Sequence, residues 1–123
     1  MTWSYLVSTE RDYYVDDVNS PVYNHWVKIP EYEMNNPRSF WASSEAMRRT
    51  DQQYEHGLII EHNTYPPVKG RGSAIFMHVW LNAATPTSGC TAMAKRDLLT
   101  VLRWLEPTAK PVLIQAPQSA LTQ

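Results

Sequence analysis

The chain of 123 residues contains a single cysteine, Cys90, so no disulfide can form within it. Its four histidines are scattered and show no C-x-x-C or H-E-x-x-H spacing, which argues against a metal site. No run approaches the roughly 18 consecutive apolar residues that a membrane-spanning helix requires. Residues 1–8 also lack the basic-then-apolar order of a secretory signal. We therefore expect no metal, no membrane span and no export segment in this sequence.

The chain also has little net charge and few phenylalanines. The formal net charge is −1, so the chain lacks the basic surplus that neutralises phosphates, and nucleic acid is not an expected partner. Two phenylalanines stand against five tryptophans and seven tyrosines. Rings with polar edges suit both β-rich cores and grooves for saccharides or peptides, and core packing is the commoner use. The length fits one domain, residues 1–123, with a single hydrophobic core.

The first half of the chain predicts loops and short strands. Turn formers cluster at residues 19–21 and 35–37. Residues 3–7 favour an extended segment. Residues 44–49 begin with a serine suited to an N-cap and continue with good helix formers, which predicts a helix of one or two turns.

The second half carries clearer patterns. Residues 58–60 predict a strand, residues 63–72 a long loop, and residues 74–80 the best-defined strand. In that last strand the even-numbered side chains share one face and the odd-numbered ones the other, and both faces are apolar enough to be buried.

A single strong helix follows at residues 95–105. Leu98, Leu102 and Leu105 form one stripe, Asp97 lies near the start, and a proline stands just beyond the end. Residues 112–115 predict a closing strand, and the tail from residue 117 is expected to be mobile. The expected fold class is mainly β with one C-terminal α-helix.

Cys90 and His78 are the candidate catalytic pair. A thiol attacks carbonyls as the thiolate, and a neighbouring imidazole can supply that state near neutral pH. The order strand with histidine, loop, small-residue turn with cysteine, then helix favours their meeting. From the residues alone, a hydrogen-bonded core histidine and a small buried cysteine stay open as alternatives.

Residues 61–93 carry a wider pattern around this pair. Its positions are His62, Asn63, Gly70, Gly72, Ser73, Ala74, Ile75, Phe76, His78, Val79, Pro86, Thr87, Gly89, Cys90 and Met93. This segment resembles the catalytic region of the YkuD-type L,D-transpeptidase family, in a branch with a shorter motif. The helix and closing strand over residues 97–115 extend the resemblance, and a weaker similarity reaches back to residues 16–24.

The resemblance implies a β-sandwich-like catalytic fold in which Cys90 attacks a carbonyl of a cell-wall stem peptide after His78 has taken its proton. Ser88 stands where the family signature usually has histidine, the interval from histidine to cysteine is short, and Ala92 replaces a frequent arginine or asparagine. The opening strands of the family domain are not recognisable, so we expect the fold to be incomplete at its N-terminus.

Further roles follow from the same resemblance. The backbone amides at Gly89 and Cys90 are expected to hold the oxyanion, since glycine allows close approach of the substrate. Ser88 is expected to assist catalysis, with a structural turn role as its alternative. Substrate contact is expected for His62, Asn63, Arg71 and Thr87, with Lys69 as a further cation; a hydrogen-bonding loop role for the first two and simple solvation of the charges stay open.

The expected function is cysteine-dependent acyl transfer on peptidoglycan stem peptides, without a metal or organic cofactor. A carboxypeptidase or endopeptidase using the same residues, and an inactive wall-binding fragment, are the alternatives. The resemblance implies a periplasmic or cell-wall location. Unpaired sheet edges predict self-association or a partner chain that completes the sheet.

Overall fold

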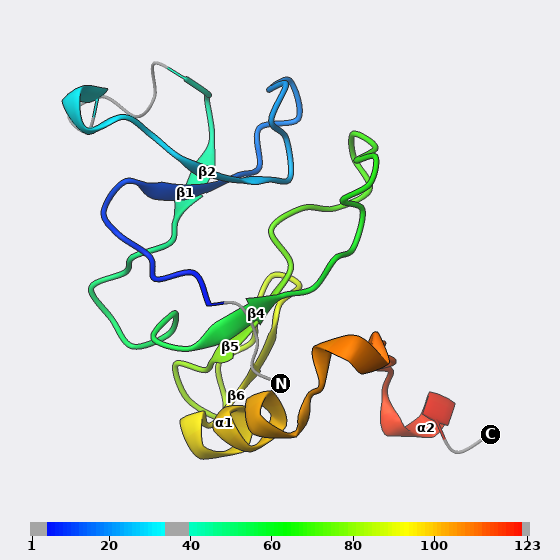
Figure 1. Cartoon of the computed structure of the whole chain (residues 1–123). Coiled ribbons are helices and arrows are strands. Elements are labelled where there is room, and N and C mark those ends of the chain that lie inside the picture. The colour runs from blue at the N-terminus through cyan, green and yellow to red at the C-terminus, as the bar shows by residue number, and fades with distance from the viewer. Residues whose placement is uncertain (1–4, 34–39, 122–123) are drawn as a thin grey trace.

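The computed structural model describes residues 5–33 and 40–121, which form two three-stranded sheets and one main helix (Figure 1). In the first sheet the central strand pairs antiparallel with both neighbours, in the order β2-β1-β3. Its strands are β1 (Asp12–Val15), β2 (Trp26–Lys28) and β3 (Ser44–Ala46). A short 3-10 turn, η1 (Glu31–Glu33), follows β2.

The second sheet carries the candidate pair and has the order β4-β5-β6. Its strands are β4 (Gly57–Ile59), β5 (Phe76–Val79) and β6 (Thr91–Met93). The central strand β5 runs antiparallel to β4 and parallel to β6, so His78 lies between Gly57 on one side and Ala92 on the other. The connection from β5 to β6 is an exposed loop.

Strand alternation divides the core into layers. Tyr14 of β1 and Phe76 of β5 meet between the two sheets, where Met47 and Ala74 complete a buried cluster. The ring centroids of Tyr14 and Phe76 are 5.0 Å apart, edge to face. Val15, the next residue of β1, points the other way and packs in a separate cluster of the first sheet. The two sheets therefore share the cluster around Tyr14 and Phe76.

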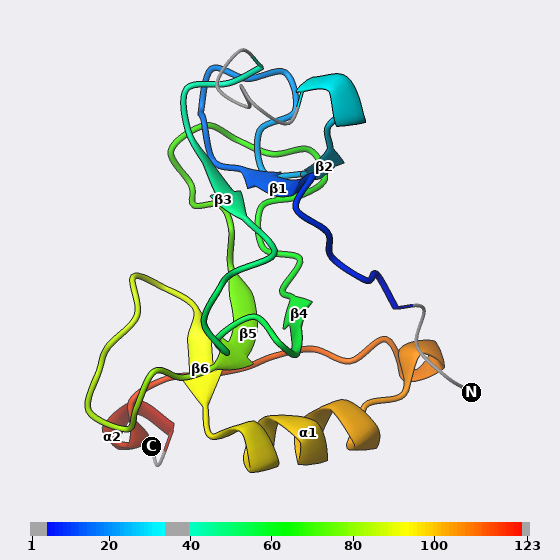
Figure 2. The same ribbon diagram turned by 90° about the vertical axis from the view of Figure 1, so that its left-hand side faces the viewer.

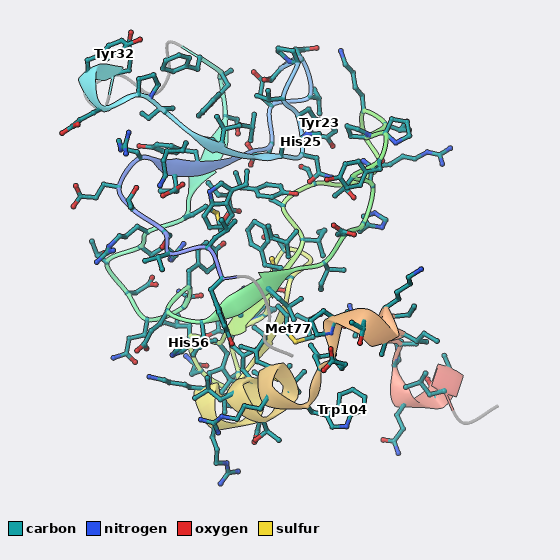
Figure 3. The ribbon with its side chains drawn as sticks, in the orientation of Figure 1. Tyr23, His25, Tyr32, His56, Met77 and Trp104 are labelled. Atoms are coloured by element: carbon teal, nitrogen blue, oxygen red, sulfur yellow. The ribbon has the colours of Figure 1, made fainter. Side chains whose placement is uncertain are left out.

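Helix α1 (Lys95–Trp104) covers the opposite face of the second sheet (Figure 2). Leu98 is fully buried against Met77 and Val79 of β5. Figure 3 shows Met77 between the sheet and α1, and Trp104, which is 79% exposed, on the outer side. Burying a leucine side chain contributes roughly 1.5–3 kcal/mol, which explains the docking of a helix of only ten residues.

The main features of the predicted fold are confirmed: the chain is mostly β with one main helix near its C-terminus. The strand predicted at residues 58–60 is β4, and the helix predicted at 95–105 is α1. The strand predicted at 74–80 contains β5, and all four residues of β5 are buried, as expected for two apolar faces.

The helix predicted at residues 44–49 is wrong. The first three of these residues, Ser44–Ala46, form β3, and Ser44 and Glu45 pair with Val15 and Tyr14 of β1. A short isolated helix is marginal in water, whereas strand pairing buries the Met47 side chain between the sheets. Long-range pairing therefore outweighs local propensity.

The strand predicted at residues 112–115 is also wrong. These residues are irregular, and Val112 and Ile114 are 82% and 81% exposed. A single side-chain hydrogen bond, 2.7 Å from Thr91 to Gln115, ties the segment to β6. Their β propensity needs a pairing strand to be realised, and none is aligned with them in the described residues.

The two ends differ from the expectations in smaller ways. Residues 5–7, the described part of the predicted segment 3–7, are irregular, and residues 3–4 and the turn predicted at 35–37 lie outside the described residues. After α1 the chain forms a 3-10 turn, η3 (Pro107–Ala109), and ends with one helical turn, α2 (Gln118–Leu121). Within the described residues, no helix has the length and apolar character needed to cross a bilayer.

Candidate active site

Cys90 lies at the end of the exposed loop, directly before β6. The hydroxyl of Thr87 closes the turn: it donates to the carbonyl of Cys90 at 2.6 Å and accepts from the amide of Gly89 at 3.3 Å. Gly89 has a φ of +154°, and a Cβ there would lie 3.3 Å from Cδ1 of Ile75. The turn that presents the sulfur therefore needs a glycine.

The sulfur of Cys90 is held against the first residues of β5. The amide of Phe76 donates to Sγ at 3.5 Å, and the thiol donates to the carbonyl of Ala74 at 3.5 Å. Burial raises the pKa of the Cys90 thiol; the Phe76 amide lowers it in part, and the Glu45 carboxylate raises it further. The thiol is thus protonated at neutral pH, and attack on a carbonyl requires a base.

His78 is the candidate for such a base. In the β5–β6 register it pairs with Ala92, and Cys90 precedes Ala92 by two residues, so the two side chains belong to the same face of the sheet. The Nδ1–H of His78 donates to the carbonyl of Val79 at 2.8 Å, which leaves Nε2 as the basic nitrogen. In the described residues no hydrogen bond joins the His78 ring to the thiol. Such bonds often tighten only once substrate is bound.

Tyr54 lies beside this pair and was not indicated by the sequence. Its ring lies 5.2 Å from that of His78, centroid to centroid, and it packs on the same buried cluster as Cys90. Its hydroxyl donates to the carboxylate of Glu45. Tyr54 falls in a segment without a clear pattern and Glu45 in the segment wrongly predicted as a helix, and their meeting depends on how the two sheets pack.

The side chains of His62 and Asn63 form their hydrogen bonds with the backbone of the loop over residues 63–72. The Nε2 of His62 donates to the Arg71 carbonyl at 2.8 Å. The Asn63 side chain donates to the carbonyls of Val68 and Gly72 and accepts from the Val68 amide, at 2.8–2.9 Å. The hydrogen-bonding loop role expected as an alternative is therefore present.

The buried side chain of Asn24 clamps this loop to the start of β5. It donates to the carbonyls of His62 and Asn63, at 3.1 and 2.7 Å, and accepts from the Ala74 amide at 3.0 Å. Asn24 is 1% exposed. The sequence indicated it only through the weak resemblance around residues 16–24.

The remaining predicted site residues lie on exposed loops. Ser88 and the Arg71 guanidinium are exposed, and neither side chain makes a hydrogen bond or ion pair within the described residues. Lys69 reaches the side chain of Asn19 at 3.5 Å. Among the hydrogen bonds of the described residues, none joins these three side chains to the sulfur. Across residues 5–33 and 40–121, no group of three or more His, Cys, Asp or Glu side chains is arranged to hold a metal ion.

Comparison with protein families gives one match. The family model described as the L,D-transpeptidase catalytic domain, YkuD, matches residues 5–114. Comparisons with curated proteins and with solved structures gave no match. The family match spans nearly the whole chain, both sheets and α1, so the chain belongs to the YkuD family of L,D-transpeptidase catalytic domains.

Proposed function

We propose that this protein transfers acyl groups on peptidoglycan stem peptides through a thioester on Cys90. One observation carries the proposal: the register of β5 with β6 assigns His78 and Cys90, which directly precedes β6, to the same face of the second sheet, and the hydrogen bond from Nδ1 to Val79 leaves Nε2 of His78 as the basic nitrogen. Membership of a family of L,D-transpeptidase-type cell-wall enzymes supports the substrate class.

The reaction begins with proton transfer. Nε2 of His78 takes the thiol proton, and the Cys90 thiolate attacks the carbonyl that follows the L-centre of the donor peptide. The tetrahedral intermediate collapses, the leaving amine takes the proton from His78, and a thioester remains on the sulfur. An acceptor amine then attacks the thioester, gives its proton to His78, and restores the thiol as the new amide forms.

The oxyanion needs donors that are already in place. The backbone amides of Cys90 and Gly89 are proposed for this role. The amide of Gly89 now donates to Thr87 Oγ1 at 3.3 Å, a long contact that substrate can replace at small cost. Thr87 therefore contributes by shaping the turn, and Ser88, exposed beside it, is proposed to donate to bound substrate.

Groups on the loop at residues 63–72 are proposed to receive the donor peptide. Arg71 and Lys69 supply positive charge for stem-peptide carboxylates, and His62 and Asn63 hold the loop that carries them. Thiolate chemistry with backbone stabilisation requires no cofactor. Because the substrate lies outside the cytoplasmic membrane, the proposed location is the periplasm or the cell wall.

Mass spectrometry of purified muropeptides incubated with the protein tests the proposal. A cross-linked dimer is the expected product, and it should be lost in Cys90→Ala. Release of a free fragment in place of a dimer would make the protein a hydrolase using the same residues. A wild-type protein that gives neither product, and no covalent adduct on Cys90 with a carbapenem, would overturn the proposal in favour of a wall-binding role.

A further inference from the structure

We propose that Tyr54, anchored on Glu45, is a positioning residue that holds the His78 ring in its catalytic orientation. The proposal rests on the proposed function, because it assigns to His78 the part of general base. Tyr54 itself is not proposed to touch a reacting atom. It acts through His78, and it links the base to the other sheet.

The first support is the contact between the rings. The centroids of Tyr54 and His78 are 5.2 Å apart with an interplanar angle of 73°, an edge-to-face arrangement. Tyr54 makes the same kind of contact with Phe76, at 5.6 Å and 86°. Phe76 and His78 lie two residues apart on one face of β5, so the Tyr54 ring covers both. This packing opposes rotation of the imidazole about its bond to Cβ.

The second support is the anchoring of Tyr54 itself. Its hydroxyl donates to the Glu45 carboxylate on β3, a strand of the first sheet. The guanidinium of Arg49 lies 5.1 Å from the ring centroid, and its Nε donates to Asp51 at 2.9 Å. Burial and the Glu45 charge raise the pKa of Tyr54 well above its usual range, so the hydroxyl stays a donor.

The third support is the backbone beside Tyr54. The carbonyl of Gln53 accepts from the amide of Val79 at 3.0 Å, and the carbonyl of Val79 accepts from Nδ1 of His78. Figure 2 shows the connection from β3 to β4 passing beside β5. Residues 53 and 54 therefore hold His78 in two ways, by a backbone relay to Nδ1 and by ring contact.

The charged and titratable groups around the Tyr54 side chain come from three segments. Glu45 lies on β3, Arg49, Asp51 and Tyr54 lie on the connection to β4, and His78 lies on β5. Glu45→Gln removes the charge of Glu45 but keeps an acceptor for the Tyr54 hydroxyl. This variant therefore separates the anchoring of Tyr54 from the electrostatic effect on Cys90.

The experiment compares Tyr54→Leu, Tyr54→Phe and Glu45→Gln with the wild type, and uses Tyr32→Phe, at an 83% exposed tyrosine, as the matched control. Two quantities are measured: kcat and KM for acyl transfer, and the tautomer of the His78 imidazole by nitrogen NMR. Tyr54→Leu should lower kcat by about 10–10²-fold, since small misplacements of a catalytic group cost this much, with KM within about twofold. Tyr54→Phe should lose less, because the ring contact remains.

The NMR readout needs no substrate, so it separates the two proposals. The wild type should show the Nδ1–H tautomer, and Tyr54→Leu a mixture of both tautomers. An unchanged tautomer in Tyr54→Leu, or an unchanged kcat, would overturn the positioning role even if the enzyme is active. Should the leucine variant fail to fold, Tyr54→Phe decides, because it removes the anchoring hydrogen bond to Glu45: an unchanged kcat and tautomer overturn the role, and a lower kcat with mixed tautomers supports it. Glu45→Gln, which keeps an acceptor for the Tyr54 hydroxyl, should retain the wild-type tautomer. If the wild type shows no acyl transfer but Tyr54→Leu still changes the His78 tautomer, only the proposed function is overturned.

Discussion

The backbone amide of Phe76 donates a hydrogen bond to the sulfur of Cys90 at 3.5 Å. This contact and the bond from the thiol to Ala74 hold the nucleophile at the edge of the core between the two sheets. The half-buried position favours the neutral thiol over the thiolate, and the Phe76 amide compensates for part of that preference. The resting Cys90 is therefore a neutral thiol, and under the proposed function the reactive thiolate forms during the attack.

The pH dependence of Cys90 alkylation tests this description. Burial raises the thiol pKa, so the rate of reaction with iodoacetamide should keep rising through and above the ordinary thiol range near about pH 8.5. The fold binds the thiol proton more tightly than the unfolded chain does, so the free energy of unfolding should decrease as pH rises through that range. A rate that is already constant below about pH 7 would indicate a preformed thiolate–imidazolium pair instead.

Replacement of the base should separate proton transfer from substrate binding. His78→Ala should lower kcat for acyl transfer by at least about 10²-fold, the low end of general-base contributions. Steady-state kinetics with a defined stem peptide measures this loss. His56→Ala, on the connection before β4, is the control and should retain activity. Activity within a few fold of wild type in His78→Ala would show that another group takes the thiol proton.

The strands and helix of the second sheet were predictable because their signals are local. In residues 74–80 both faces of the two-residue alternation are apolar, and in residues 95–105 leucines repeat at helical spacing. In both segments the hydrophobic period that predicts the element also predicts which side chains are buried. Residues 44–49 carry no such agreement. Their conformation is determined by the pairing of Glu45 with Tyr14, about thirty positions earlier in the chain. Local propensity carries no information about such a distant partner.

The same distinction holds at the site. Cys90 and His78 could be named as the candidate pair from the sequence because residue type and order restrict the chemistry that they can perform. Tyr54 and Asn24 reach the site through the packing of one sheet on the other, in the contacts of Tyr54 with His78 and of Asn24 with Ala74. Contacts of this kind become visible only when the two sheets are assembled.

Loss of the Asn24 side chain should destabilise the whole fold. Asn24→Ala would leave the buried amide of Ala74 and two loop carbonyls without partners, and an unsatisfied buried group costs roughly 1–3 kcal/mol. Alanine would also occupy a φ of +59°, which adds backbone strain of about 1 kcal/mol. We expect the free energy of unfolding to decrease by about 3 kcal/mol in urea titrations.

A second asparagine offers the matched control for that measurement. Asn19 is exposed, so Asn19→Ala should change the free energy of unfolding by no more than about 0.5 kcal/mol. Equal effects of the two variants would mean that the bonds made by Asn24 contribute little beyond those of a surface asparagine.

Gly89 should be required for activity more than for folding. Gly89→Ala forces a side chain into a φ of +154°, where strain costs about 1–3 kcal/mol, and brings its Cβ to 3.3 Å from Ile75. The end of the Ile75 side chain can move away by a few tenths of an ångström, but the strain at φ is relieved only by a backbone shift that moves Cys90 and its amide, so kcat should decrease by about 10-fold or more. Gly70→Ala is the control, since Gly70 also has a positive φ, +80°, but nothing lies within 4 Å of its added Cβ. It should lose about 1 kcal/mol of stability and keep its kcat, with any loss of activity confined to KM, because its loop is proposed to bind the donor peptide. Equal losses of kcat in both variants would show that general backbone strain, and not the position of the Cys90 turn, limits the reaction.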